Sequence, residues 1–133
     1  MPGASGTGSC SGRCSPTSRK GVEVIFTAAK LKVRPADADR WPAIVEGFTG
    51  ATRSEPGCRF FEWSRSLEDP TEHVLVEAFW DDEAGAAHVG SAHFAAARED
   101  LPPHLLATPG SVNVTLPQDD WSLLGKMAVP WEA

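Results

Sequence analysis

The segment HVLVEAFW (residues 73–80) constrains the fold most, because it is apolar on both faces. Alternate side chains of an extended strand point to opposite sides of a sheet. One side of this strand carries Val74, Val76, Ala78 and Trp80, and the other carries Leu75 and Phe79. A sheet that contains such a strand needs cover on both faces.

The neighbouring segments predict the element order β-α-β-β-α-β. Strands are expected at residues 22–33, 58–67, 73–80 and 111–116. A helix capped by Asp37 or Asp39 should end near Ser54, because apolar residues recur at helical spacing from Trp41 to Ala51. Two short helices are expected at residues 82–90 and 92–101. This order is the α+β, ferredoxin-like split βαβ unit.

The helices of this unit can cover only one face of the sheet, and a core of about 95 residues is marginal on its own. We therefore expect a homodimer whose sheets stack face to face as a dimeric α+β barrel. The C-terminal segment, residues 118–133, is too apolar for a free end. We expect it to pack on the partner subunit or back over its own domain. Its large apolar residues are Trp121, Leu123, Leu124, Met127 and Trp131.

Composition separates residues 1–21 from the domain at residues 22–117. The first segment consists mostly of Gly, Ser, Thr, Pro and Cys and is predicted to be a disordered leader. It contains three basic residues and no acidic ones, so the rest of the chain carries 9 − 18 = −9 and should repel nucleic acid. No apolar run is long enough to cross a membrane. Cys10 and Cys14 could form half of a metal site, but Cys58 is distant in sequence, so a metal site is not expected. Three cysteines form no disulfide framework, which predicts a reducing, cytoplasmic location.

Two histidines are the candidate bases of a catalytic site. His88 and His93 flank Gly90-Ser91, where one predicted helix gives way to the next, so both could face one cleft. Imidazole can accept a proton near neutral pH. A structural role remains open for His93, either buried against the sheet or at the helix junction. His73 and His104 are expected to be exposed.

Glu77 stands in the middle of the apolar third strand. A buried carboxylate needs a partner or a role, because an unpaired buried charge is unfavourable. It could accept a hydrogen bond from a histidine or pair with Arg59 or Arg65, and structural pairing is favoured over direct chemistry. Glu62 is a similar case with weaker support.

Aromatic residues could form the walls of a pocket for a flat ligand, although such residues more often belong to the core. They are Phe60, Phe61, Trp63, Phe79, Trp80 and Phe94. No glycine-rich nucleotide-binding motif is present, so neither flavin nor nicotinamide is expected.

Three runs of sequence resemble the antibiotic-biosynthesis monooxygenase family, small dimeric α+β proteins that include quinol monooxygenases. The runs are AAKLKVRPADADRW, TRSEPGCRFFEWSRSLEDP and HVLVEAFWDDEAGAAHVGSAHFAAAREDL, within residues 24–117. The most specific pieces are Glu55-Pro56-Gly57-Cys58, Glu77 and His88-x4-His93-Phe94. The resemblance implies oxidation of an aromatic phenol or hydroquinone by O2 without flavin, haem or metal.

The resulting hypothesis is a cofactor-independent monooxygenase that converts a polyketide-like phenol or hydroquinone to a quinone. His88 is the first candidate base, with His93 and Glu77 as further catalytic candidates. The residues expected to hold the aromatic ring are Phe61, Trp63, Phe79, Trp80 and Phe94. The alignment with the family leaves open whether Phe79 or Trp80 matches the family's aromatic residue. The choice matters, because the two side chains point to opposite faces of the sheet.

Two departures from the family keep alternatives open. Leu75 or Val76 stands where polyketide-oxidising relatives place an asparagine, and the chain has no tyrosine. A non-catalytic binding module for an aromatic metabolite is therefore the second hypothesis. A haem-binding relative is less favoured, because Arg98 aligns with the ligand histidine and cannot ligate iron as imidazole does.

Overall fold

The computed structural model describes residues 23–118 and 120–131, and its centre is a four-stranded antiparallel sheet. The strands are β1 (Val24–Lys32), β2 (Cys58–Arg65), β3 (Glu72–Phe79) and β4 (Gly110–Leu116), in the order β2-β3-β1-β4. This confirms the predicted α+β, ferredoxin-like fold. The predicted leader, with Cys10 and Cys14, lies outside the described residues.

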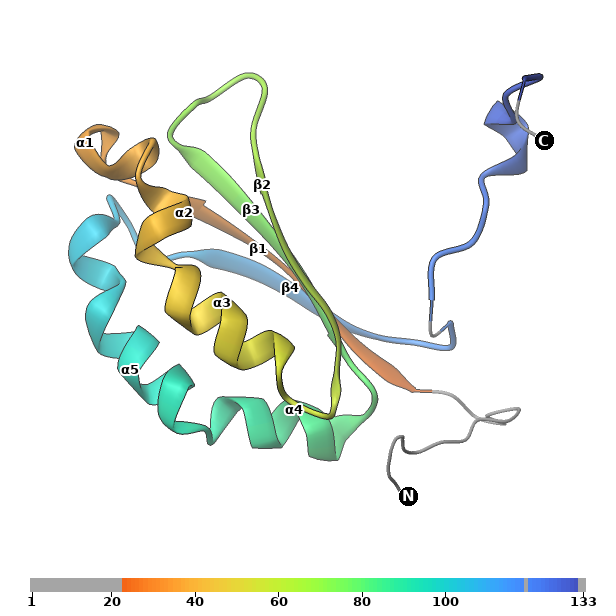
Figure 1. The fold of residues 1–133 in the computed structure, drawn as a ribbon, viewed down its shortest axis with the longest axis horizontal. Coiled ribbons are helices and arrows are strands. Elements are labelled where there is room, and N and C mark those ends of the chain that lie inside the picture. Colours follow the sequence, from red (N-terminus) through yellow and green to blue (C-terminus); the bar gives the residue numbers. More distant parts are fainter. Residues whose placement is uncertain (1–22, 119, 132–133) are drawn as a thin grey trace.

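The helices lie together on one side of the sheet (Figure 1). They are α1 (Pro35–Ala38), α2 (Trp41–Ile44), α3 (Glu46–Arg53), α4 (Asp82–Val89) and α5 (Ala92–Asp100). Two single 3-10 turns follow, η1 (Pro102–His104) and η2 (Gly125–Met127). None of the described helices has the length and apolar character that crossing a membrane requires.

The prediction of a single helix before Ser54 is wrong, because this region forms three short helices. Pro35 begins α1 at a position that suits its fixed backbone angle, so Asp37 lies inside α1 and neither Asp37 nor Asp39 caps a helix through its side chain. Pro42 falls within α2 and has no amide hydrogen to donate. Val45 then separates α2 from α3 with a backbone that is not helical. The expected apolar face survives these breaks, and Trp41 and Val45 are buried.

Two expectations about histidine exposure are also wrong. His73 is only 4% exposed and lies against Trp41, with ring centres 5.8 Å apart. Burial lowers the pKa of His73 from its usual value. His104 is partly buried, and its Nδ1 lies 2.8 Å from Oδ2 of Asp37. This contact ties η1 to α1.

A bulge in β2 changes which side chains face the helices. Cys58 pairs with Phe79, whereas Phe60 pairs with the adjacent Ala78, so Arg59 is the extra residue. Directly paired residues share a face of the sheet. Cys58 therefore lies on the same face as Phe79 and Phe61, contrary to the strict alternation expected from the sequence.

The face of the sheet opposite the helices is apolar, and the described residues cover it only in part. Phe26 pairs with Ala78 and with Val114, which places these side chains on this face. Val112 is 64% and Val114 42% exposed. In the C-terminal segment, Trp121 reaches Phe60, with ring centres 5.4 Å apart. The other large apolar residues described in that segment are exposed: Leu123, Leu124, Met127, Val129 and Trp131.

Gly57 allows the turn before β2 to approach α4 closely. A Cβ at Gly57 would lie 2.3 Å from Cβ of Ala84, so we expect Gly57→Ala to lower the free energy of unfolding by roughly 1–3 kcal/mol. Gly50 is the control, because it is exposed in the middle of α3 and an added Cβ would meet no atom within 4 Å. Gly50→Ala should raise the free energy of unfolding by about 0.5–1 kcal/mol. Urea unfolding at equal protein concentration measures both changes. Equal effects of the two substitutions would contradict the close approach.

Candidate active site

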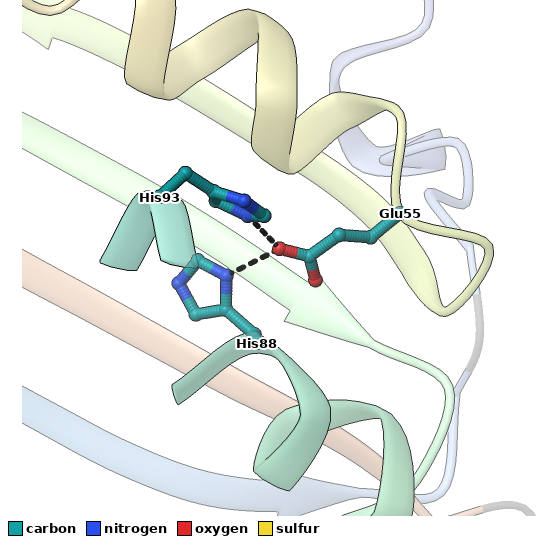
Figure 2. Close-up of side chains that lie close together, drawn as sticks. All are labelled: Glu55, His88 and His93. Carbon is teal, nitrogen blue, oxygen red and sulfur yellow. Dashed lines mark hydrogen bonds and ion pairs between the residues drawn. The ribbon is translucent and has the colours of Figure 1, made fainter. Parts of the chain in front are cut away.

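Three separate elements bring one carboxylate and two imidazoles together beneath the helices (Figure 2). Glu55 lies in the turn between α3 and β2, His88 in the last turn of α4, and His93 in the first turn of α5. Ser91 fixes the junction of α4 and α5. Its hydroxyl accepts a hydrogen bond from the Phe94 amide and donates one to the His88 carbonyl oxygen at 2.7 Å.

Both imidazoles bond to the same oxygen of Glu55. Nδ1 of His88 lies 2.8 Å from Oε2 of Glu55, and Nε2 of His93 is hydrogen-bonded to that atom as well. When Glu55 is ionised its carboxylate only accepts hydrogen bonds, and this arrangement then assigns a hydrogen to each of these two ring nitrogens. The side chains of His88 and Glu55 are 5% and 13% exposed, and that of His93 is 25% exposed. The three groups form one unit that opens toward solvent at His93.

Aromatic rings surround His88. Phe79 stacks on it with ring centres 4.8 Å apart, and Phe94 meets it edge-on at 5.1 Å. Phe61 lies 6.1 Å away. Phe48 of α3 contacts both histidines, with ring centres 5.9 Å from His88 and 6.2 Å from His93. From the sequence, the helical spacing of Phe48 predicts only a core residue and does not indicate its contact with the two histidines.

Glu77 lies on the inner side of His88. Its Oε1 is 3.7 Å from Nε2 of His88 and has no hydrogen-bond partner within the described part of the chain. Burial, and then the charge of Glu55, raises the pKa of Glu77 to about 7. Of the partners considered for Glu77, the structure brings a histidine close, whereas Arg65 pairs with Asp39 at 2.7 Å.

The same surroundings act on Cys58. Burial, followed by the charges of Glu55 and Glu77, raises the pKa of this thiol to about 12. A thiol with such a pKa is protonated at neutral pH and is a poor nucleophile. Cys58 is therefore not a candidate nucleophile.

The other predicted ring-binding residues lie at different distances from the histidines. Phe79 lies on the helical face of the sheet and contacts His88. Trp80 instead lies against Arg59, whose guanidinium carbon is 4.3 Å from the ring centre. Trp63 donates from Nε1 to Oγ1 of Thr49 at 2.9 Å and borders the core around Trp41.

Glu55 is the residue of this unit that sequence reasoning missed. The sequence presents it only as part of the turn Glu55-Pro56-Gly57 and of the family-like motif that ends at Cys58. The carboxylate in that motif was the one feature of the sequence that could have indicated a role for Glu55 in the site. Its distance in sequence from His88 and His93 concealed the contact.

A match to a protein-family model shows the family to which the chain belongs. The family model described as antibiotic biosynthesis monooxygenase matches residues 24–100, more than half of the sequence. The chain belongs to the antibiotic biosynthesis monooxygenase family. The match ends before β4, short of the 24–117 that the resemblance suggested, and it includes Glu55, Glu77, His88 and His93. No curated protein matches the sequence.

Solved structures, two of them assigned to this family, share the fold. The Rv0793 protein of Mycobacterium tuberculosis is 25% identical, with a TM-score of 0.65 over 74% of this chain and 99% of that one. A Caulobacter crescentus protein assigned to the family is 23% identical, with a TM-score of 0.66 over 77% of this chain and 93% of its own. A Nitrosomonas europaea protein with the same assignment is 22% identical, with a TM-score of 0.65 over 71% and 91% of the two chains.

The raised pKa of Glu77 predicts a pH-dependent stability. Between pH 4.5 and about 7 the folded chain holds a proton that the unfolded chain has released, so the free energy of unfolding falls as pH rises through this range. The full loss would be about 3 kcal/mol. Glu77→Gln should remove this loss and make the protein more stable than wild type at pH 8, but not at pH 4.5.

Glu62→Gln is the matched control, because Glu62 is exposed on the neighbouring strand β2. Urea unfolding across the pH range measures the dependence for both variants. An unchanged pH dependence in Glu77→Gln would contradict the raised pKa.

Proposed function

We propose that this family member is a cofactor-independent monooxygenase that oxidises an aromatic phenol or hydroquinone to a quinone with O2. The observation that carries the proposal is the Glu55–His88–His93 unit surrounded by phenylalanine rings. Family membership supports oxygenation in general. The choice of substrate rests on the chemistry of this site.

The reaction needs a base because a phenolate transfers an electron to O2 more readily than a phenol. Removal of the hydroxyl proton is followed by transfer of one electron to O2, and the two radicals then combine into a ring peroxide. Loss of water from the peroxide leaves a carbonyl. One oxygen atom of O2 enters the quinone and the other leaves as water, so the four electrons that O2 accepts all come from the substrate.

We assign the substrate hydroxyl to the His93 end of the unit. His88 is nearly buried between Glu55 and Glu77, whereas the side chain of His93 is 25% exposed. Nδ1 of His93, the ring nitrogen that is not bonded to Glu55, would receive the proton. Glu55 would stabilise the charged ring, and His88 would hold the Glu55 carboxylate in place through its hydrogen bond. Phe94 and Phe48 would flank the ring of the substrate, and the aromatic surroundings would limit water.

We further propose that the working form is a homodimer joined through the uncovered face of the sheet. Val112 and Val114 expose apolar surface on this face, and the exposed C-terminal segment supplies further apolar side chains for a second copy. In Figure 1 this segment extends away from the helices. The cytoplasmic location expected from cysteine usage stays a prediction.

The activity is tested by oxygen consumption with hydroquinones and anthrones and no added cofactor. We expect turnover by wild type, and a decrease of about tenfold or more in His88→Ala, His93→Ala and Glu55→Gln, in line with general-base contributions of about 10² to 10⁴. His104→Ala is the matched control, since it removes a histidine that also pairs with a carboxylate. Stabilisation by the aromatic ligand without oxygen consumption would instead favour the non-catalytic binding module.

The dimer is tested by analytical ultracentrifugation. Wild type should sediment as a dimer, and Val112→Asp should shift it toward the 14.2 kDa monomer, because a charge would be buried between two sheets. Leu67→Asp is the control, since Leu67 is fully exposed in the loop between β2 and β3. A monomeric wild type at micromolar concentration would contradict the proposed assembly.

A further inference from the structure

We propose that Glu55, His88 and His93 also form a binding site for a divalent transition-metal ion such as Zn²⁺ or Co²⁺. Two imidazole nitrogens and one carboxylate oxygen are a donor set that these ions accept. The three donor atoms lie within 4.8 Å of one another. An ion at about 2.0–2.2 Å from each donor would take the place of the hydrogens that now join the rings to Glu55.

Glu77 lies close to His88, in the position of a carboxylate that accepts a hydrogen bond from a metal-binding histidine. Metal-binding histidines usually donate their second ring N–H to a carboxylate, which fixes the tautomer of the ring. His88 presents Nδ1 to Glu55, and its Nε2 lies 3.7 Å from the unpartnered Oε1 of Glu77. Binding of a metal at Nδ1 would move the ring hydrogen to Nε2, where Glu77 can accept it.

Charge and access also favour a cation at this place. The Oε1 atoms of Glu55 and Glu77 are both buried and lack hydrogen-bond partners among the described residues. A divalent ion would offset the two neighbouring carboxylates. Phe79 and Phe94 enclose the inner side of His88, while His93 is partly exposed and offers a route of entry. These features match the enclosed surroundings and entry path that a metal site needs.

The metal site and the proposed oxidation can fail independently. A metal at Nε2 of His93 would move the ring hydrogen to Nδ1 and leave no ring nitrogen free to take up a proton, so the metal-loaded protein would be a state distinct from the one that oxidises phenols. Metal binding is measured without a substrate, and oxygen consumption is measured on protein stripped with a chelator.

The test uses the stripped full-length protein titrated with Co²⁺ and then with Zn²⁺. We expect one ion per chain, with the visible spectrum of Co²⁺ bound by nitrogen and oxygen and without the near-ultraviolet bands of sulfur ligation, which excludes the cysteines. With Zn²⁺, the ¹⁵N spectrum should show the ring hydrogen of His88 moving from Nδ1 to Nε2.

Variants separate this site from adventitious binding. His93→Gln and Glu55→Gln should each weaken binding more than about a hundredfold, because changes at outer partners alone typically weaken it about 10- to 100-fold. Glu77→Gln should fall in that smaller range while the protein stays folded, and His104→Gln should bind as wild type does. Unchanged affinity in His93→Gln, or no binding at millimolar Co²⁺, would overturn the proposal.

Discussion

An ionised carboxylate shielded from water is favourable only where hydrogen-bond donors reach it, and Glu55 meets this requirement on the helical side of the protein. Glu55 receives two donors, one from the end of α4 and one from the start of α5. The turn that carries Glu55 can approach α4 only because Gly57 has no side chain. One oxygen atom thus links a turn to the ends of two helices.

The sheet divides the molecule into two functional sides. Its helical face holds the histidines, both glutamates and the phenylalanine rings, and therefore provides the chemistry of the site. Its other face exposes Val112 and Val114, and this is the surface on which we propose that a second chain packs. β3 is apolar on both sides, and the described helices lie on only one face of the sheet, which is why we propose a second chain on the other.

Local patterns in the sequence predicted the strands and the overall order of strands and helical regions, because alternation and helical spacing report which side of an element is buried. They also singled out His88, His93 and Glu77. They did not predict that the first helical region divides into three short helices. They could not predict the bulge at Arg59, which moved Cys58 to the helical face, or the burial of His73, since both depend on neighbouring strands. The role of Glu55 required the contact itself, because the turn and the two helix ends are distant in sequence.

The central claim is that Glu55 and His93 act as one catalytic unit, and a double-mutant cycle on the rate of oxygen consumption tests it most directly. When two residues act as one unit, the first substitution already removes most of the rate enhancement that the pair provides. The account predicts that the double variant Glu55→Gln, His93→Gln is no slower than the slower single variant. Effects on the activation free energy that add in the double variant would contradict it.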